Sequence, residues 1–289
     1  MTDKTPSIAY VITTYNRRAL LEIALSSVTQ QFSEHDKVII IDDESNDDTE
    51  AFCNGLIQTS NQIIYHRLDK NSGVNAARQA AINVVKSTDC DWISYIDDDD
   101  YLTKDAHQQF IRDQQKLTDT LWFAYPAIDE NNNSLTTTPG SGLFSYIEDY
   151  MGKRIIKGDF QHFLHIDIAT QCTFTDKFRN AEVWFFWCQV SHLTAMYIAE
   201  QPGVVKQYLE EGITHSGFNR DRKLEVAKMK VEMLEDIMSP KQFSKQLRNL
   251  GKALVKSNDK KTAKPILIRA IKLNPSLISA YKYYIQSCL

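Results

Sequence analysis

The sequence predicts an α/β fold, a mostly parallel sheet with helices on both faces, followed by a small α-helical C-terminal region. Two observations carry this prediction. Before about residue 125, short apolar segments rich in β-branched side chains alternate with segments of helical period. From Arg220 onward the pattern is helical. We therefore expect two domains, at residues 1–219 and 220–289.

The alternation of strands and helices begins at the N-terminus. Strands are expected at residues 7–13, 37–41, 63–67, 92–96 and 121–125, and helices at residues 18–31, 49–60, 76–86 and 104–116. Asp47 or Asp48 is expected to cap the second of these helices. Residues 144–180 mix aromatic and charged side chains without a clean period, and we expect a substrate-side subregion there.

The second half of the chain is expected to be mainly helical. We place a helix at residues 180–197, a short strand at 204–208, a loop at 213–219, and helices at 221–238, 243–256, 262–272 and 276–286. Ser239 is expected to cap a helix, with Pro240 at its first helical position. The last helices resemble one tetratricopeptide-type pair, and one copy is too few for a repeat array.

Composition indicates a soluble protein of 289 residues, with 43% hydrophobic and 24% charged side chains. No apolar run approaches the roughly 20 residues that span a bilayer. The polar N-terminus lacks the pattern of a signal peptide. Five scattered cysteines without a CxxC pair fit a reduced, cytoplasmic protein without structural zinc.

Four consecutive aspartates, Asp97, Asp98, Asp99 and Asp100, form the most unusual feature, which we call the aspartate run. Neighbouring carboxylates repel one another unless a cation or hydrogen-bond donors neutralise them. Because the run follows an expected strand, it could deliver ligands for a hard divalent ion to a sheet edge. A solvated acidic turn is the alternative. Two further polar clusters, residues 13–17 and 42–46, also follow expected strands, which favours a ligand site at this edge.

Four ordered motifs resemble those of family-two, A-type nucleotide-sugar glycosyltransferases. They are Ile12-Thr13-Thr14-Tyr15-Asn16-Arg17, Ile41-Asp42-Asp43-Glu44-Ser45, Asn71-Ser72-Gly73-Val74-Asn75-Ala76-Ala77-Arg78 and Ile96-Asp97-Asp98-Asp99-Asp100. The match covers about the first 125 residues. The resemblance implies the A-type glycosyltransferase fold, with residues 1–219 as the catalytic domain. It also implies a metal-dependent, inverting transfer from a UDP-sugar or dTDP-sugar to a hydroxyl of a glycan or lipid-linked saccharide, in cell-envelope polysaccharide synthesis.

The resemblance also implies roles for individual residues. Asp99 is expected to bind Mn²⁺ or Mg²⁺ directly, and Asp97 or Asp98 to hold the ribose or a metal-bound water. Asp43 would accept the pyrimidine ring N–H. The remaining expected contacts are Thr13 and Tyr15 against base and ribose, Arg78 on the diphosphate or base side, Gly73 in a turn near the nucleotide, and His215 on the metal or diphosphate.

The catalytic base is expected to be Glu182, because inverting transfer requires deprotonation of the acceptor hydroxyl. It lies in Ala181-Glu182-Val183-Trp184, where many members of the family have Glu-Asp. Val183 therefore keeps open a nucleotide-sugar-binding or scaffolding protein with little turnover. A nucleotidyltransferase is disfavoured, since residues 13–18 contain no glycine. For His162 and His165 we expect an acceptor-side or structural role.

Charge is distributed unevenly along the chain. Residues 220–289 hold 16 Lys and Arg against 6 Asp and Glu, while the whole chain has a net charge of −4. We expect the basic helices to dock on an anionic membrane surface or on a partner chain, with solvent as the plain alternative. No nucleic-acid partner is expected. The protein is thus predicted to be cytoplasmic, with a peripheral position at the inner face of the membrane.

Overall fold

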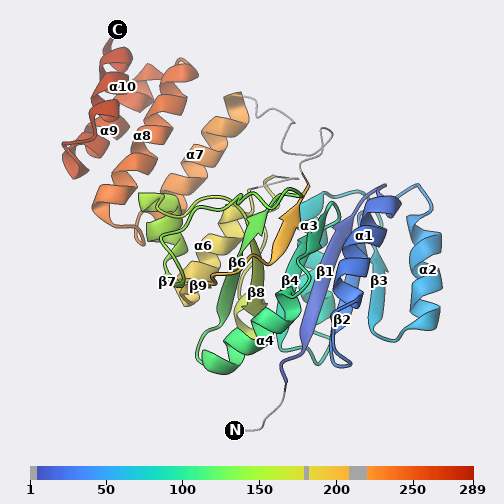
Figure 1. Cartoon of the computed structure of the whole chain (residues 1–289). Coiled ribbons are helices and arrows are strands. Elements are labelled where there is room, and N and C mark those ends of the chain that lie inside the picture. Colours follow the sequence, from blue (N-terminus) through green and yellow to red (C-terminus); the bar gives the residue numbers. More distant parts are fainter. Residues whose placement is uncertain (1–4, 179–181, 208–219) are drawn as a thin grey trace. The chain divides into compact units, whose positions relative to one another are not determined.

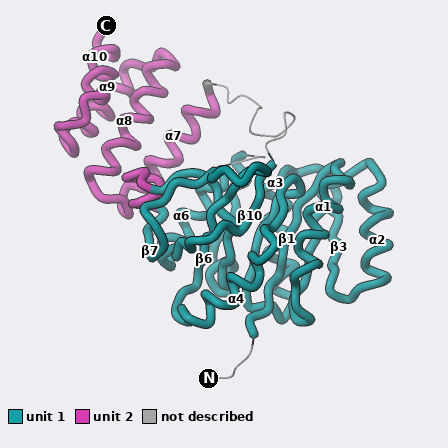
Figure 2. The backbone as a smooth tube through the Cα atoms, viewed as in Figure 1, with its two compact units in different colours: residues 1–146, 156–213 teal, residues 147–155, 214–289 magenta. Residues whose placement is uncertain are grey.

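The computed structural model describes residues 5–178, 182–207 and 220–289 (Figure 1). The chain forms two units, and their residues are interleaved (Figure 2). Unit 1 comprises Met1–Tyr146 and Ile156–Ile213, whereas unit 2 comprises Ile147–Ile155 and Thr214–Leu289. The assignment of residues 147–155 to unit 2 depends on packing between distant segments, and the sequence pattern did not predict it.

Unit 1 is built on one ten-stranded sheet. Its main path runs β3 (Ile63–Arg67), β2 (Lys37–Asp42), β1 (Ile8–Thr14), β4 (Trp92–Asp97), β8 (Phe160–His165), β6 (Trp122–Ile128), β10 (Val204–Lys206) and β5 (Asp100–Leu102). Strand β9 (Met196–Ile198) pairs with β6, and β7 (Gly142–Phe144) pairs with β9. Strands β1 to β4 are mutually parallel, as the alternating sequence pattern predicted.

Strand β8 lies inside the sheet, antiparallel to both β4 and β6, and makes the sheet mixed. The sequence did not predict it, because its Phe-Gln-His-Phe-Leu-His pattern places polar residues among apolar ones. The structure satisfies these polar groups internally. Gln161 is buried and donates to Ser94 Oγ at 2.8 Å and to the Tyr95 carbonyl at 3.0 Å. Hydrogen bonds of this kind offset the free-energy cost of burying a polar side chain in a strand.

The helices of unit 1 follow the predicted order in its first half. They are α1 (Arg18–Thr29), α2 (Thr49–Thr59), α3 (Val74–Val85), α4 (Ala106–Lys116), the short α5 (Ile166–Ala169) and α6 (Trp184–Leu193). Figure 1 shows α1 and α4 in front of the sheet and α3 and α6 behind it. Asp47, rather than Asp48, bonds the first turn of α2, through Oδ1 and the Thr49 N–H at 3.1 Å.

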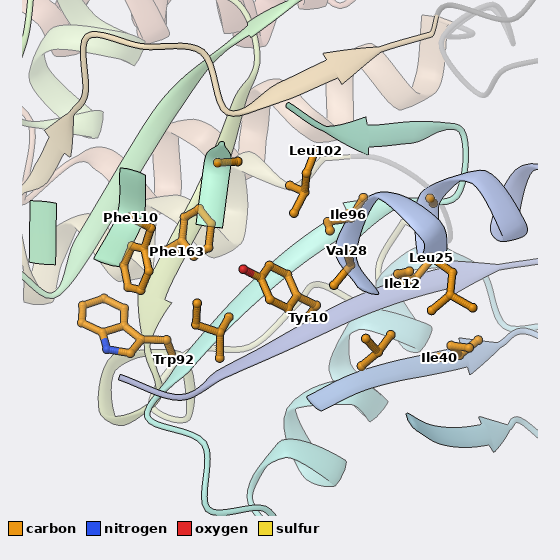
Figure 3. Close-up of a cluster of buried hydrophobic side chains, with 14 of the residues drawn as sticks. Tyr10, Ile12, Leu25, Val28, Ile40, Trp92, Ile96, Leu102, Phe110 and Phe163 are labelled. Carbon is orange, nitrogen blue, oxygen red and sulfur yellow. The ribbon is translucent and has the colours of Figure 1, made fainter. Parts of the chain in front are cut away.

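The core of unit 1 shows how strand alternation directs side chains (Figure 3). Tyr10 and Ile12 of β1 are fully buried in the cluster that also contains Val28 of α1. Phe110 of α4 stacks on Phe163 of β8, with ring centroids 4.3 Å apart. Tyr10 of β1 meets Phe163 edge-on, and Trp92 of β4 meets Phe110 edge-on. This packing holds β1 and β4 relative to each other and positions the loops at their carboxyl ends.

Unit 2 consists of α7 (Arg220–Leu234), α8 (Pro240–Lys256), α9 (Lys260–Leu273) and α10 (Ile278–Cys288), with most of the π-helix η1 (Tyr146–Lys153). Pro240 begins α8 as predicted. Ser239 precedes it, but its hydroxyl donates to Glu148 of η1 at 2.9 Å instead of capping α8. Gly251 allows α8 and α9 to approach closely, since a Cβ there would lie 2.5 Å from Leu267.

Among the residues that the structure describes, no helix has the length and apolar composition needed to cross a bilayer.

Candidate active site

The carboxyl ends of β1, β2 and β4 bring the three polar clusters to one edge of the sheet. Thr14 pairs in register with Asp42 of β2, and Thr13 pairs with Asp97 of β4. The Asp43 N–H donates to the Thr14 carbonyl at 2.9 Å, which extends this contact past the end of β2. The three clusters singled out in the sequence therefore adjoin one another, as parallel strands require.

Each carboxylate of the aspartate run has a basic partner. Asp97 pairs with Arg78 of α3 and lies 3.6 Å from the Lys206 ammonium. Arg17 lies 3.1 Å from both Asp98 and Asp99.

Asp98 and Asp100 have further hydrogen-bond donors. The Thr14 hydroxyl donates to Asp98 at 2.8 Å. Asp100 pairs with Lys206 and also accepts the Gln207 N–H at 3.3 Å. Three cations thus face four carboxylates, which leaves an excess of one negative charge in the cluster.

Burial and this charge excess shift the pKa values of the cluster. Burial would raise the pKa of Asp97, but Arg78 and Lys206 outweigh it and hold that pKa well below its usual range. Burial raises the pKa of Asp98 to about 6, although Thr14 and Arg17 oppose the rise. Burial and the charge of Asp97 also raise the pKa of Asp99. Burial also raises the pKa of Asp100 to about 7, although Lys206 opposes the rise.

The donor set fits a hard divalent cation only if a ligand completes it. Within residues 5–178, 182–207 and 220–289, no three His, Cys, Asp or Glu side chains gather closely enough to hold a metal alone. The Asp99 side chain is 19% exposed, whereas that of Asp98 is 8% exposed and holds Thr14 as well as Arg17. Mg²⁺ is commonly bound by one or two carboxylates plus phosphate oxygens. Asp97 is more exposed, at 37%, but its two oxygens face Arg78 and Lys206, so Asp99 is the member of the run that could offer an oxygen to such an ion.

The Asp43 carboxylate forms hydrogen bonds within the protein. Its two carboxylate oxygens accept the Ser72 and Gly73 N–H groups, each at 2.7 Å. Gly73 has φ of 90°, a conformation that glycine adopts without strain, and it immediately precedes α3. Asp43 therefore fixes the turn from which α3 carries Arg78 toward Asp97.

Thr13 and Tyr15 differ in their access to ligand. Thr13 is buried at the end of β1, while the Tyr15 side chain lies just beyond this strand and is 42% exposed. An exposed aromatic ring beside the polar sheet edge could stack on a planar base.

Glu182 precedes α6 and adopts φ of 62°. Its carboxylate accepts the Trp184 indole N–H. The helix it precedes is anchored by Phe186, which stacks on Phe174 at 4.2 Å and contacts Tyr95 of β4. Ala181 and His215, both named from the sequence, lie outside the described residues.

The two histidines of β8 have structural partners. The Trp122 indole N–H donates to His162 Nδ1 at 3.1 Å, and the His162 ring lies 4.1 Å from Trp187. Burial, with a smaller effect of Lys206, lowers the pKa of His162 to about 3, so this imidazole is neutral. His165 accepts the Asp167 N–H at 3.3 Å and caps α5.

Sequence reasoning missed two residues of this cluster, Arg17 and Lys206. Arg17 belongs to a motif that was recognised, and its charge beside the expected strand end was an available signal. Lys206 had no such signal. It follows two valines in an ordinary short strand, and its place beside the aspartate run depends on the pairing of β10 with β5.

Comparisons with known proteins agree on a family and a fold. Residues 10–174 match the family model described as glycosyl transferase family 2. The putative glycosyltransferase EpsH of Bacillus subtilis is 24% identical over 159 residues, which cover 55% of this chain and 44% of that protein. The GalNAc(5)-diNAcBac-PP-undecaprenol β-1,3-glucosyltransferase of Campylobacter jejuni is 29% identical over 103 residues, covering 35% of this chain and 32% of that protein. The chain thus spans less than half the length of these two relatives.

Among solved structures, residues 1–349 of S. aureus TarS in complex with UDP-GlcNAc superpose with a TM-score of 0.60 at 13% identity. The superposition covers 97% of this chain and 79% of that one. At this identity the likeness concerns the fold alone. It confirms the expected A-type arrangement, a mixed sheet with helices on both faces followed by C-terminal helices.

Proposed function

Because the chain belongs to glycosyl transferase family 2, we propose that it transfers a sugar from a UDP-sugar or dTDP-sugar to a hydroxyl of a glycan or lipid-linked saccharide. We further propose that the transfer inverts the anomeric centre and serves cell-envelope polysaccharide synthesis. One observation carries the proposal: the carboxyl ends of β1, β2 and β4 gather a partly neutralised aspartate run beside an exposed aromatic ring. The bound UDP-GlcNAc of TarS and the undecaprenol-linked saccharide in the Campylobacter enzyme's name support the choice of donor and acceptor.

The nucleotide would lie across the ends of β1 and β2. Tyr15 would stack on the base or ribose with its exposed ring, and Thr13 would line the same pocket. Asp43 would accept the pyrimidine N–H beside the turn that it holds at Ser72 and Gly73. Asp97 or Asp98 would hold the ribose or a metal-bound water.

The diphosphate would lie against the aspartate run. Asp99 would hold Mn²⁺ or Mg²⁺, with His215 as a further contact to the metal or diphosphate. When bound, such an ion would act as a Lewis acid that stabilises the negative charge on the departing diphosphate. Arg78 would add positive charge on the same side while it keeps Asp97 in place.

Glu182 would act as the general base. A bond forms between the acceptor oxygen and the anomeric carbon while the bond from that carbon to the diphosphate breaks. The acceptor proton passes to the Glu182 carboxylate. Attack from the face opposite the leaving group inverts the anomeric centre. The Trp184 indole N–H orients this carboxylate in the structure.

A donor screen in the presence of Mn²⁺ tests the activity. The proposal predicts release of a nucleoside diphosphate with one UDP-sugar or dTDP-sugar and an acceptor saccharide. If no donor gives release, and calorimetry detects no nucleotide binding, the proposal is wrong.

A nucleotide-sugar-binding or scaffolding protein with little turnover is the second candidate, and Val183 favours it. This apolar residue stands where many members of the family carry an aspartate. Comparison of wild type with Glu182→Gln separates the two candidates. Equal residual rates would support binding without catalysis, whereas a large loss in the variant would support transfer.

The basic helices of unit 2 are proposed to dock on the anionic inner face of a membrane. Helix α10 exposes three apolar side chains at helical spacing, with Ile278 82%, Tyr281 38% and Ile285 57% exposed. Residues 220–289 carry a net charge of +10. An apolar stripe on a basic helical unit suits the interface of an anionic bilayer.

A further inference from the structure

Lys206 connects the two ends of the aspartate run. Strand β10 pairs with β5 in antiparallel register, and this register places Lys206 opposite Asp100. The Lys206 ammonium pairs with Asp100 and lies 3.6 Å from Asp97 Oδ2, and its side chain is 18% exposed. The following residue, Gln207, adds a backbone N–H to Asp100 at 3.3 Å. The site therefore includes a half-buried lysine that the four motifs do not contain.

The charge of this lysine is maintained by its neighbours. Burial alone would lower the pKa of Lys206, but Asp97 and Asp100 outweigh it and hold that pKa well above its usual value. A charged ammonium is worth more here than at the surface, because the low local dielectric strengthens its attraction for both carboxylates. Within the described part of the chain, removing it would leave Asp100 with only the Gln207 backbone N–H, and Asp97 with Arg78 alone.

By pairing with two of the carboxylates, Lys206 also determines which of the four could bind another cation. It occupies Asp100 and one oxygen of Asp97, whose other oxygen pairs with Arg78. Asp98 is held by Thr14 and Arg17, while Asp99 has Arg17 as its one side-chain partner among the described residues. The internal cations thus contact every carboxylate of the run, and Asp99 shares its cation, Arg17, with Asp98.

We propose that Lys206 is a positioning residue that holds Asp97 and Asp100, reserves Asp99 for the divalent cation, and keeps metal affinity low until a nucleoside diphosphate arrives. This inference rests on the proposed function. Lys206 acts in it as a fixed counter-charge. Without the lysine, Asp97 and Asp100 become additional ligands, so a divalent cation binds the free protein more tightly and away from its working position.

Binding of Mn²⁺ to the full-length protein, measured by electron paramagnetic resonance without nucleotide, tests the proposal. Lys206→Met should bind Mn²⁺ at least about tenfold more tightly than wild type, because a positive charge is removed within a few ångströms of the ion. Lys206→Arg should stay within about threefold of wild type, since it retains the charge. Lys116→Met, on the exposed end of α4, is the matched control and should change nothing.

A double variant separates the effect of the lost charge from an effect of misfolding. Lys206→Met with Asp100→Asn restores the net charge of the cluster, so its Mn²⁺ affinity should return to within about threefold of wild type. In assays, Lys206→Met should need less Mn²⁺ for half-maximal rate while its kcat falls. Unchanged or weaker Mn²⁺ binding by Lys206→Met would overturn the inference. Failure of wild type to bind Mn²⁺ even with UDP would instead overturn the proposed metal dependence.

Discussion

Arg78 of α3 and Asp97 of β4 form an ion pair that joins two of the sequence motifs. Each residue was expected at the nucleotide site, but their pairing was not. The pair places the Arg78 guanidinium over the start of the aspartate run, where a diphosphate is proposed to lie. Arg78 therefore both neutralises a carboxylate and supplies a donor edge for an anion, tasks that its five N–H groups allow.

Replacement of Arg78 by alanine should weaken binding of UDP in the presence of Mn²⁺ by at least about tenfold, because a charged hydrogen bond to phosphate is worth roughly 1.5–3 kcal/mol. Calorimetric titration measures this change. Arg112→Ala, which removes an exposed arginine of α4, is the control and should bind as wild type does. Equal affinities for the Arg78 variant and wild type would contradict a diphosphate role.

Gly73→Ala should destabilise unit 1 by about 1 kcal/mol, because alanine is strained at φ of 90°. It should also weaken UDP binding, since Gly73 and Asp43 together fix the turn before α3. Gly55→Ala is an informative control. Gly55 lies inside α2 with no atom within 4 Å of an added Cβ, so this change should stabilise by about 0.5–1 kcal/mol. Urea unfolding measures both, and equal effects would refute the strain argument.

His162 should make stability depend on pH. Its pKa is about 3 in the folded protein and about 6.5 in an unfolded chain, so the unfolded state binds the extra proton between these values. Stability from this group is fully present above about pH 6.5 and decreases as pH falls. Between pH 7.5 and 5.5, wild type should lose about 1 kcal/mol more unfolding free energy than His162→Gln in urea titrations. An equal loss in both proteins would show that His162 does not carry this dependence.

Membrane docking should depend on the apolar stripe of α10. Ile278→Asp with Ile285→Asp should reduce co-sedimentation with phosphatidylserine vesicles by at least about tenfold. The reason is that charged residues replace the exposed apolar side chains that are proposed to enter the bilayer interface. Vesicles of neutral lipid should bind poorly, and salt should weaken binding to anionic ones. Ile57→Asp, a change at an exposed position of α2, is the control. Binding that survives the double substitution would exclude this stripe as the docking surface.

The sequence was most informative where structure is local. Apart from β5 (Asp100–Leu102), the strands and helices of residues 7–116 were predicted because each segment carries its own period and its own polar end. Strand β8 was missed because its polar residues are buried only through bonds to β4 and to Trp122, which are distant in sequence. The η1 segment was missed for a similar reason, since its partners, Ser239 and Lys245, follow about 90 residues later.

The residues of the candidate site were likewise predictable from the sequence only in part. The motifs around Thr13, Asp43 and Asp97 could be placed together because parallel strands end at one edge. Lys206 could not be placed, since only the register of β10 and β5 brings it to Asp100. The internal hydrogen bonds of Asp43 were also invisible in the sequence, because backbone donors of a distant turn satisfy it.

The central claim is that the aspartate run binds a metal–nucleotide through Asp99, and calorimetric titration of UDP with and without Mn²⁺ tests it most directly. Wild type should bind UDP at least about tenfold more tightly with Mn²⁺, Asp99→Asn should lose this gain, and the exposed Asp105→Asn should keep it. An Asp99→Asn protein that still gains affinity from Mn²⁺ as wild type does would contradict the account.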